Sequence, residues 1–218
     1  MCGRFNLIAT RQLIIDHFGL LSLPAHNPDY NIPPGQKILA VVQLEDGSKK
    51  AVNLHWGLIP SWSHDGKISS RLINARAESL LEKPSFRNAY QHRCYLIPAT
   101  GFFEWQATGA AGKRPYHVHY PDNRLFAFAG IWEHWEHDQK TVYSCAIITT
   151  AANDKIAPIH ARMPVLIPPD DYNRWLDKNN TAPEIPDFLA ADAYSKMQLT
   201  AISTRVNNPL HNDEKCLI

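Results

Sequence analysis

The second residue of this chain could present two nucleophiles, a backbone α-amine and a side-chain thiol. Cys2 directly follows Met1, and methionine aminopeptidases remove a first methionine when the next side chain is small. The mature chain would then expose an α-amine and a thiol two carbons apart. An α-amine has a reference pKa of about 7.7–8.0, against about 10.4 for lysine, so more of it is unprotonated at neutral pH. It can condense with an aldehyde to an imine, which the thiol can close into a thiazolidine ring.

The residues next to Cys2 fit this chemistry. Gly3 allows a ligand or the backbone to come close, and Arg4 supplies a positive field that would favour a thiolate and could hold an anion. Position alone leaves another interpretation open, in which Cys2 is simply the second residue of a frayed terminus. The rest of the chain has to decide between the two.

Two further side chains could transfer protons. Glu104 lies between Phe103 and Trp105, and aromatic surroundings raise the pKa of a carboxyl group because they remove its hydration. Alternation along a strand could instead turn Glu104 to solvent. His160 lies in an irregular segment, 157–164, between proline and arginine residues. It could shuttle protons or serve as a structural hydrogen-bonding residue.

Asn74 and Arg76 flank Ala75, so both side chains point the same way if the segment is extended. An amide beside a guanidinium suits a sugar-phosphate, and it also suits a buried hydrogen-bond network. Zinc could use three of four other histidines with a water, but no thiol or carboxylate ligand accompanies them. These are His117, His119, His134 and His137. We expect them at solvent-facing strand ends, and we expect no metal and no cofactor.

The composition is that of an ordinary globular protein, with 44% hydrophobic and 20% charged residues among 218. The chain has 22 Lys and Arg residues and 21 Asp and Glu residues, so its net charge is +1. This near-neutral charge argues against a protein that coats duplex nucleic acid through its overall electrostatic field. Four widely spaced cysteines without a CxxC pattern indicate a reducing cytosol. No apolar run reaches transmembrane length, so we expect a soluble cytoplasmic protein without a leader or membrane contact.

Short strand-like segments make up most of the chain. They are expected at 37–43, 50–56, 93–98, 101–106, 115–120, 125–132, 141–150 and 197–203. Helices are expected at 10–20, between a Thr10 cap and Gly19, and at 170–178, while Pro84 should break a third. This pattern predicts one α+β domain, residues 1–218, built on a curled, barrel-like, mostly antiparallel β-sheet with flanking short helices.

Eight short motifs, in order along nearly the whole chain, resemble the SRAP (SOS-response-associated peptidase) family. They are residues 2–5 (CGRF), 30–35 (YNIPPG), 56–60 (WGLIP), 74–78 (NARAE), 101–105 (GFFEW), 149–153 (TTAAN), 159–164 (IHARMP) and 203–207 (STRVN). The resemblance implies a protein that recognises abasic sites in single-stranded DNA and traps them covalently through its N-terminal cysteine. It also implies possible abasic-site lyase activity and self-processing peptidase activity.

The resemblance assigns roles to particular residues. Cys2 is the nucleophile, and Asn74, Glu104 and His160 line its pocket. The residues expected to contact DNA are Arg4, Trp62, Arg76 and Arg162. Ser63 departs from the pattern, because many members carry a second aromatic residue there. We therefore expect weaker wedging of a neighbouring base.

Two other functions stay open on the sequence alone. Class II glutamine amidotransferases also begin Met-Cys-Gly, although we find no glutamine-binding or oxyanion-hole motif. A non-covalent single-strand binder could use arginine and tryptophan platforms. The expected state is a monomer, associated with the nucleoid when bound to DNA.

Overall fold

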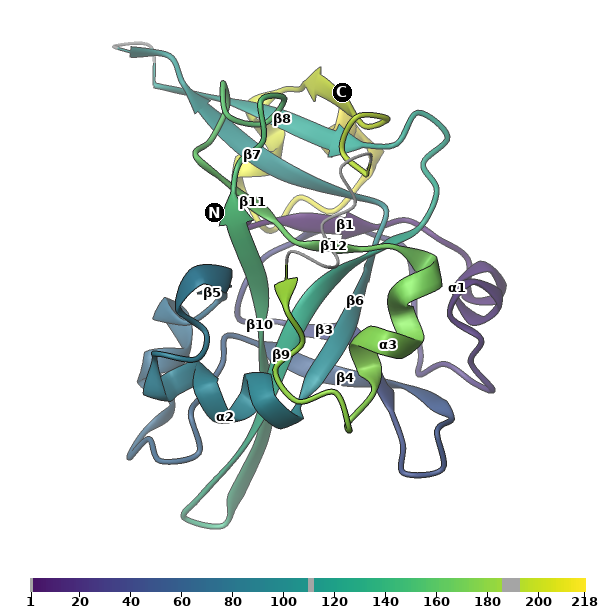
Figure 1. The fold of residues 1–218 in the computed structure, drawn as a ribbon. Helices are drawn as coiled ribbons and strands as arrows, with labels where there is room; N and C mark the ends of the chain where they lie inside the picture. The colour runs from purple at the N-terminus through teal and green to yellow at the C-terminus, as the bar shows by residue number, and fades with distance from the viewer. Residues whose placement is uncertain (1, 110–111, 186–192) are drawn as a thin grey trace.

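The computed structural model describes residues 2–109, 112–185 and 193–218, whose strands form two sheets (Figure 1). In the larger sheet the strand order is β11-β10-β4-β3-β6-β9-β12, and β10 also pairs with β9. This extra pairing closes five of the strands into a barrel. Its strands are β3 (Lys37–Gln43), β4 (Lys49–Trp56), β6 (Cys94–Ala99), β9 (Phe126–His137) and β10 (Lys140–Ala151).

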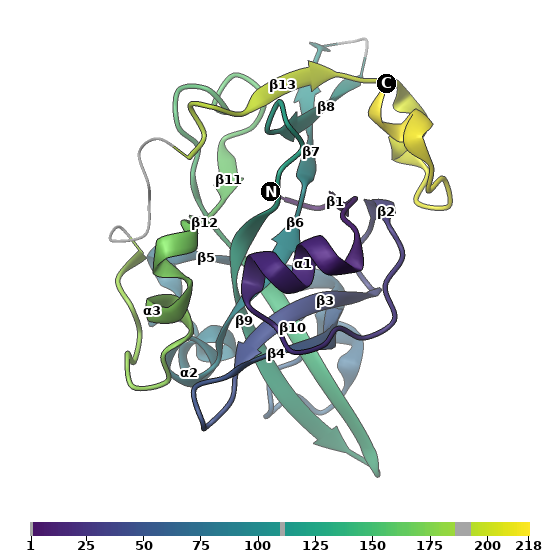
Figure 2. The same cartoon turned by 90° about the vertical axis from the view of Figure 1, so that its right-hand side faces the viewer.

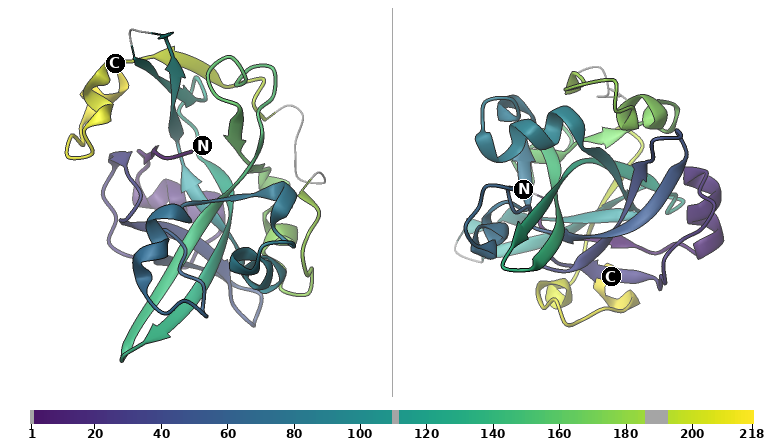
Figure 3. Two further views of the ribbon diagram at one scale, coloured as in Figure 1. Left: turned by 90° about the vertical axis from the view of Figure 1, so that its left-hand side faces the viewer. Right: turned by 90° about the horizontal axis from the view of Figure 1, so that it is seen from below.

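Three short strands extend the barrel wall, because β11 and β5 pair with β10 and β12 pairs with β9. They are β5 (Asn74–Arg76), β11 (Arg162–Pro164) and β12 (Leu166–Ile167). The hairpin of β9 and β10 extends beyond the barrel, and Figure 3 shows its tip pointing away from the N-terminus.

The smaller sheet has the order β13-β8-β7-β1-β2 and covers the end of the barrel where the chain begins (Figure 2). Its strands are β1 (Phe5–Leu7), β2 (Asp29–Ile32), β7 (Gly101–Ala107), β8 (Lys113–His119) and β13 (Gln198–Ala201). Phe5 attaches β1 to the barrel, since its ring lies 5.2 Å from Trp56 and 5.8 Å from Phe128, both edge-on. The start of the described chain therefore packs against the barrel, and Cys2 is fully buried.

Short helices lie around the barrel: α1 (Arg11–Phe18), α2 (Pro84–His92) and α3 (Tyr172–Leu176), with 3₁₀ turns η1 (Gly66–Arg71), η2 (Ala77–Ser79), η4 (Pro169–Asp171), η6 (Thr204–Asn207) and η7 (Glu214–Leu217). The expected ends of α1 are confirmed: Thr10 accepts from the Leu13 N–H, and Gly19 ends the helix at φ +63°. Of the helices in the described ranges, none is long and apolar enough to cross a membrane.

The α+β class and the barrel-like sheet expected from the sequence are confirmed. The expectation that Pro84 would break a helix is wrong. Pro84 begins α2 instead, because the first turn of a helix leaves its N–H groups unpaired and tolerates a residue without one. The strands expected at 125–132 and 141–150 extend further, to His137 and from Lys140, into one long hairpin.

Candidate active site

The position of Cys2 follows from the pairing of β1 with β7. Phe5 lies opposite Phe102, and one step nearer the N-terminus the Phe103 N–H donates to the Arg4 carbonyl oxygen at 2.9 Å. The same register, continued, brings residue 3 opposite Glu104. Cys2 is fully buried, with 0% of its surface exposed. The frayed-terminus interpretation is therefore wrong, and Met1 lies outside the described residues.

Glu104 is buried on the side of β7 that faces the barrel, with 2% of its surface exposed. Alternation along β7 turns Phe103 and Trp105 to the opposite side, where they pack in a second, smaller apolar cluster. The solvent-facing alternative for Glu104 is therefore wrong. Burial raises the pKa of the Glu104 carboxyl group, and the charge of the nearby His160 opposes this in part.

His160 is held by its own loop and by the start of β11. Its backbone N–H donates to the Ile156 carbonyl oxygen at 3.0 Å, which closes a turn that begins at Asn153. The ring Nδ1 lies 2.9 Å from the Arg162 N–H and 3.1 Å from the Arg162 carbonyl oxygen. A neutral ring can accept from the first and an imidazolium can donate to the second. The backbone of Arg162 thus accommodates both protonation states, as a proton shuttle requires.

Asn74 reaches Cys2 from the barrel side. β5 pairs in parallel with β10, which buries Ala75 completely and turns Asn74 and Arg76 to the other face, as the sequence predicted for an extended segment. The Asn74 side-chain N–H donates to the Cys2 carbonyl oxygen at 2.9 Å. The Asn74 Oδ1 is buried and accepts no hydrogen bond from the residues that the structure describes.

The Cys2 thiol is not activated as a thiolate. Its pKa is raised above the ordinary cysteine value, first because the thiol is buried and second because the negative charge of Glu104 is close, while the Arg4 backbone N–H opposes this. The expected thiolate stabilisation by the Arg4 side chain is wrong, since its guanidinium group donates to Asn31 and to the Val206 carbonyl oxygen, both at 2.8 Å. At neutral pH the thiol keeps its proton.

The three arginines expected on the DNA path differ in their surroundings. Arg162 donates to both carboxylate oxygens of Glu78, from Nη1 at 2.6 Å and from Nη2 at 2.8 Å. Its Nη2 also donates to the Thr149 carbonyl oxygen at 2.6 Å. Its hydrogen bonds hold the pKa of Glu78 below its ordinary value. Arg76 is exposed beside Asn74, whereas Arg4 is half-buried and engaged as described above. Their contact with phosphate remains a prediction.

Trp62 lies on the loop after β4 and is 56% exposed, as expected for a ring that meets a ligand. Within the described ranges it shares no hydrogen bond with the other candidate residues. Ser63 is nearly buried: its hydroxyl donates to the Asp65 carbonyl oxygen, and its own carbonyl oxygen accepts from Trp135 Nε1 at 2.7 Å. The side chain at position 63 therefore faces the protein rather than a neighbouring base.

Sequence reasoning missed Tyr194, which forms a further wall of the site. It is 4% exposed, its hydroxyl donates to the Pro164 carbonyl oxygen, and its ring meets Phe102 edge-on at 6.4 Å. Burial raises its pKa, and the neighbouring Cys2 and Glu104 act in the same direction. Tyr194 belongs to none of the recognised motifs, so the sequence carried no signal for it.

The histidines weighed for zinc lie on different sheets. His117 and His119 stack on β8 with ring centroids 4.3 Å apart. His117 is buried and hydrogen-bonds to Asn6, so the expectation of a solvent-facing position is wrong for this residue. His134 and His137 lie on β9, where they stack on Tyr143 and Trp135. In the described part of the chain, no group of three or more potential ligands could hold a metal ion.

With this geometry established, known proteins provide a comparison. A model of the SOS response associated peptidase (SRAP) family matches residues 1–209. Abasic site processing protein YoaM of Bacillus subtilis is 39% identical over 223 residues, which cover 100% of this chain and 97% of that protein. Abasic site processing protein HMCES of Gallus gallus is 30% identical over 229 residues, covering 88% of this chain and 66% of that protein.

Solved structures show the same fold. A protein of Bacteroides thetaiotaomicron aligns with a TM-score of 0.83 and 25% identity, covering 99% of this chain and 98% of its own. A protein of Bordetella bronchiseptica aligns with a TM-score of 0.80 and 21% identity, covering 93% of this chain and 100% of its own. The barrel with its covering sheet is therefore shared over almost the full length of these proteins.

Proposed function

This chain belongs to the SOS response associated peptidase (SRAP) family, and we propose that it recognises abasic sites in single-stranded DNA and crosslinks to them through Cys2. The observation that carries the proposal is the enclosure of Cys2 between a buried carboxyl group, Glu104, and the amide of Asn74. The names of the relatives, which are abasic site processing proteins, support the choice of substrate.

The proposed reaction begins at the sugar. An abasic deoxyribose is mostly a closed hemiacetal, so a general acid must donate a proton to the ring oxygen before the aldehyde appears. The Cys2 amine, free once Met1 is removed, adds to the aldehyde carbon to give a carbinolamine. Loss of one water gives an imine. The thiol then adds across the C=N bond, with its proton going to nitrogen, and a thiazolidine results.

Glu104 and His160 are the proton carriers in this scheme. Burial raises the pKa of the Glu104 carboxyl group, so it holds its proton to a higher pH than an exposed carboxyl group does. We assign ring opening to Glu104, and we assign to His160 assistance at the ring oxygen and in the carbinolamine steps. The contacts of His160 Nδ1 with both backbone groups of Arg162 support a ring that changes protonation state.

The protonated state of the Cys2 thiol sets the order of events. Because burial and Glu104 raise the thiol pKa, the amine attacks first and sulfur follows. Without sulfur, the imine would acidify the neighbouring sugar carbon and promote β-elimination, which breaks the strand. One site would then act as a lyase or as a protective crosslinker, depending on how fast the thiol captures the imine.

We further propose that DNA is held by arginine and tryptophan side chains near the site, with the protein acting as a monomer on nucleoid DNA. Arg76 is exposed for such contact and Trp62 offers a stacking surface. Arg162 could contact DNA only through N–H groups that are not bound to Glu78, and Arg4 only through N–H groups that are not bound to Asn31. The family name also supports a peptidase activity, which we propose is confined to removal of Met1.

Intact mass after mixing with an abasic oligonucleotide tests the proposal. We expect one species at the sum of the two masses less one water, from protein that begins at Cys2. A variant with extra residues ahead of Cys2 should form no such species. Cys2→Ala keeps the amine, so it should give a borohydride-trappable imine and strand cleavage without a heat-stable adduct.

Four outcomes would contradict the proposal. Full crosslinking by the variant that keeps its extra residues ahead of Cys2 would show that the Cys2 amine does not take part in the reaction. A stable adduct from Cys2→Ala would exclude the thiol. Glutaminase activity in place of crosslinking would favour an N-terminal-nucleophile amidohydrolase, and undiminished DNA binding without any adduct would favour a non-covalent binder.

A further inference from the structure

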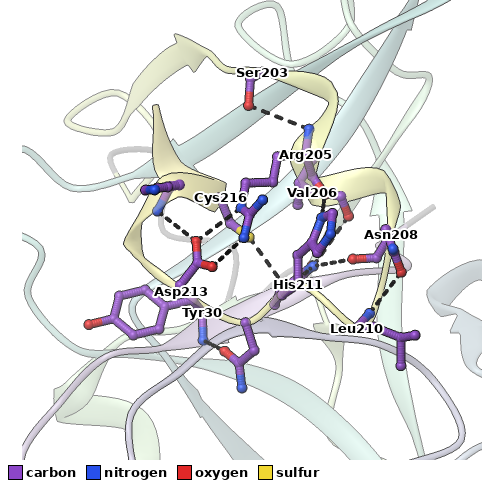
Figure 4. A network of polar contacts seen from close by, with 12 residues as sticks. Tyr30, Ser203, Arg205, Val206, Asn208, Leu210, His211, Asp213 and Cys216 are labelled. Carbon is purple, nitrogen blue, oxygen red and sulfur yellow. Dashed lines mark hydrogen bonds and ion pairs between the residues drawn. The ribbon is translucent and has the colours of Figure 1, made fainter.

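Two motifs of the sequence, at residues 30–35 and 203–207, have no role in the chemistry proposed above. The structure brings them together. Residues 202–218, which we name the C-terminal clamp, run from the end of β13 through η6 and η7 and fold back so that the Ser203 N–H donates to the Ile218 carbonyl oxygen at 2.9 Å. Figure 4 shows the polar contacts within this clamp and with β2.

The clamp is fixed internally by polar contacts (Figure 4). Arg205 pairs with Asp213 through two hydrogen bonds, at 2.5 and 3.1 Å. The Arg205 carbonyl oxygen lies 3.0 Å from His211 Nδ1, and the Cys216 thiol donates to the His211 carbonyl oxygen. These contacts hold the carbonyl groups of the segment in a fixed arrangement that a neighbouring side chain can bind.

That side chain is Asn31, which is 1% exposed in β2. Its Nδ2 lies 2.7 Å from the His211 carbonyl oxygen, 3.1 Å from that of Asn208 and 3.3 Å from that of Val206. Its Oδ1 accepts from the Arg4 guanidinium group at 2.8 Å. One buried amide thus joins the clamp to a residue two positions from Cys2.

Arg4 carries this connection into the active site. The same Nη1 that donates to Asn31 also donates to the Val206 carbonyl oxygen at 2.8 Å. The backbone of Arg4 accepts from Phe103, and its N–H points at the Cys2 sulfur. The side chain of Arg4 is therefore held by the clamp while its backbone sets the position of Cys2.

The clamp also supports β7 from behind. Phe103 packs in the second apolar cluster against Val206 and Cys216 of the clamp. Trp105 Nε1 donates to Asn207 Oδ1 at 2.7 Å. Both aromatic residues flank Glu104, whose own side chain points to the other side of the strand. The clamp therefore fixes both strands that carry the reacting groups.

We infer that Asn31 is a positioning residue, which couples the C-terminal clamp to Arg4 and so fixes Cys2 near Glu104. This inference rests on the function proposed above. The Asn31 side chain is buried, and its hydrogen bonds join the Arg4 guanidinium group to backbone carbonyl groups of the clamp, none of which is a reacting atom. We therefore expect its effect in the rate of reaction of bound DNA rather than in the affinity for DNA.

The test compares Asn31→Ala with the parent protein, both beginning at Cys2. At saturating abasic single-stranded DNA we expect the single-turnover crosslinking rate to fall by about 10- to 100-fold, the range expected when reacting groups are misplaced by a fraction of an ångström to an ångström. The Kd for intact single-stranded DNA should stay within about twofold. Hydrogen exchange of the amides of residues 2–7 should become faster.

A matched control separates positioning from general loss of stability. Leu96→Ala removes a fully buried side chain of the barrel wall, which lies in a different apolar cluster from Val206 and Cys216 of the clamp. It should keep the parent rate at a temperature where both variants are folded. If Asn31→Ala does not fold, Asp213→Asn provides the second variant. It removes the charge of the Arg205–Asp213 pair, while an asparagine Oδ1 can still accept from the Lys215 N–H that caps η7. We expect a smaller loss of rate with unchanged Kd.

A folded Asn31→Ala protein that crosslinks at the parent rate would overturn the inference, and so would an equal loss of rate in Leu96→Ala. If the parent itself forms no crosslink, the proposed function fails. The exchange measurement then still tests the positioning, because faster exchange at residues 2–7 in Asn31→Ala supports it and unchanged exchange excludes it.

Discussion

The side-chain amide of Asn74 donates to the carbonyl oxygen of Cys2 across 2.9 Å, although 72 positions separate the two residues in the chain. β5 delivers Asn74 to this point through its parallel pairing with β10. The hydrogen bond fixes the carbonyl group of Cys2, and the buried Asn74 Oδ1 accepts no hydrogen bond from the described residues. Asn74 is thus placed to orient the nucleophile without itself gaining or losing a proton.

Asn74→Ala should therefore slow crosslinking without abolishing it. One net hydrogen bond is worth about 0.5–1.5 kcal/mol, which corresponds to a loss of about 2- to 13-fold in rate. Single-turnover kinetics at saturating abasic DNA measures it. Asn53→Ala, an exposed asparagine on β4, is the control and should react like the parent. Equal rates for the parent, Asn74→Ala and Asn53→Ala would show that Asn74 does not contribute to the reaction.

Glu104→Gln keeps the size of the side chain and loses its proton transfer. General acid–base assistance is typically worth about 10²–10⁴-fold, so crosslinking should slow by about that range while DNA binding hardly changes. His160→Ala should slow the reaction less, because His160 only assists. The measurement is the rate of adduct formation with a natural abasic site.

An acyclic aldehyde substrate shows how much of the loss of rate in Glu104→Gln comes from ring opening and how much from imine formation. It needs no ring opening, so it should restore part of the rate of Glu104→Gln, whereas the imine steps stay impaired. Parent-like rates for Glu104→Gln on a natural abasic site would show that Glu104 is structural. The proton shuttle would then belong to His160 alone.

The sequence predicted that Asn74 and Glu104 lie near Cys2, but it did not predict the electrostatics of these residues. Local signals were sufficient for α1 and for the edges of β3, because caps and alternating apolar residues act within a few positions. The burial of Glu104 depends on the barrel covering one face of β7, which alternation along a single strand cannot reveal. The thiol pKa was misjudged for the same reason: adjacency in sequence suggested Arg4, whereas burial dominates.

Long-range pairs were also invisible in the sequence. Arg162 and Glu78 both belong to recognised motifs, but nothing in either motif shows that the two side chains bind each other across 84 positions. Asn31 likewise gave no hint of its four contacts with Arg4 and the C-terminal clamp. Such pairs are set by the topology of the two sheets, which decides the neighbours of each strand.

The raised pKa of Glu104 also makes a prediction about stability. A carboxyl group whose pKa is higher in the folded than in the unfolded state binds protons more tightly when folded, so unfolding becomes easier as pH rises from the unfolded pKa through the folded pKa. Glu104→Gln removes the ionisable group, and with it this loss of stability at higher pH. The variant should have a higher Tm than the parent at pH 7–8, and the difference should shrink to nothing below about pH 4.

Thermal unfolding of both proteins between pH 3.5 and pH 8 measures this difference. Each unit of pKa difference corresponds to about 1.4 kcal/mol, and each kcal/mol to about 2–4 °C in Tm for a chain of this size. Glu82→Gln changes an exposed carboxyl group and should show no such trend. A Tm of Glu104→Gln below that of the parent at pH 8 would mean that the charged form of Glu104 is stabilised.

The ion pair between Arg162 and Glu78 should limit the affinity for DNA. Both arms of the guanidinium group are held by the carboxylate, and the lowered pKa of Glu78 keeps that carboxylate charged throughout the neutral range. Glu78→Gln should free Arg162 for a phosphate group. The affinity for single-stranded DNA should rise, and the slope of log K against log salt should steepen by about 0.7, the value of one added phosphate contact.

Binding isotherms of intact single-stranded DNA at several salt concentrations provide the test. If Arg4, Arg76 and Arg162 all contact phosphate in the parent, its slope is roughly −2 to −3, and a shallower slope means that Glu78 withholds Arg162. Glu82→Gln removes the same charge from a neighbouring position without an arginine partner among the described residues, so it controls for the change in net charge. Equal effects of Glu78→Gln and Glu82→Gln would show that only the overall field matters. A loss of affinity in Glu78→Gln alone would show that Glu78 holds Arg162 in the orientation that DNA requires.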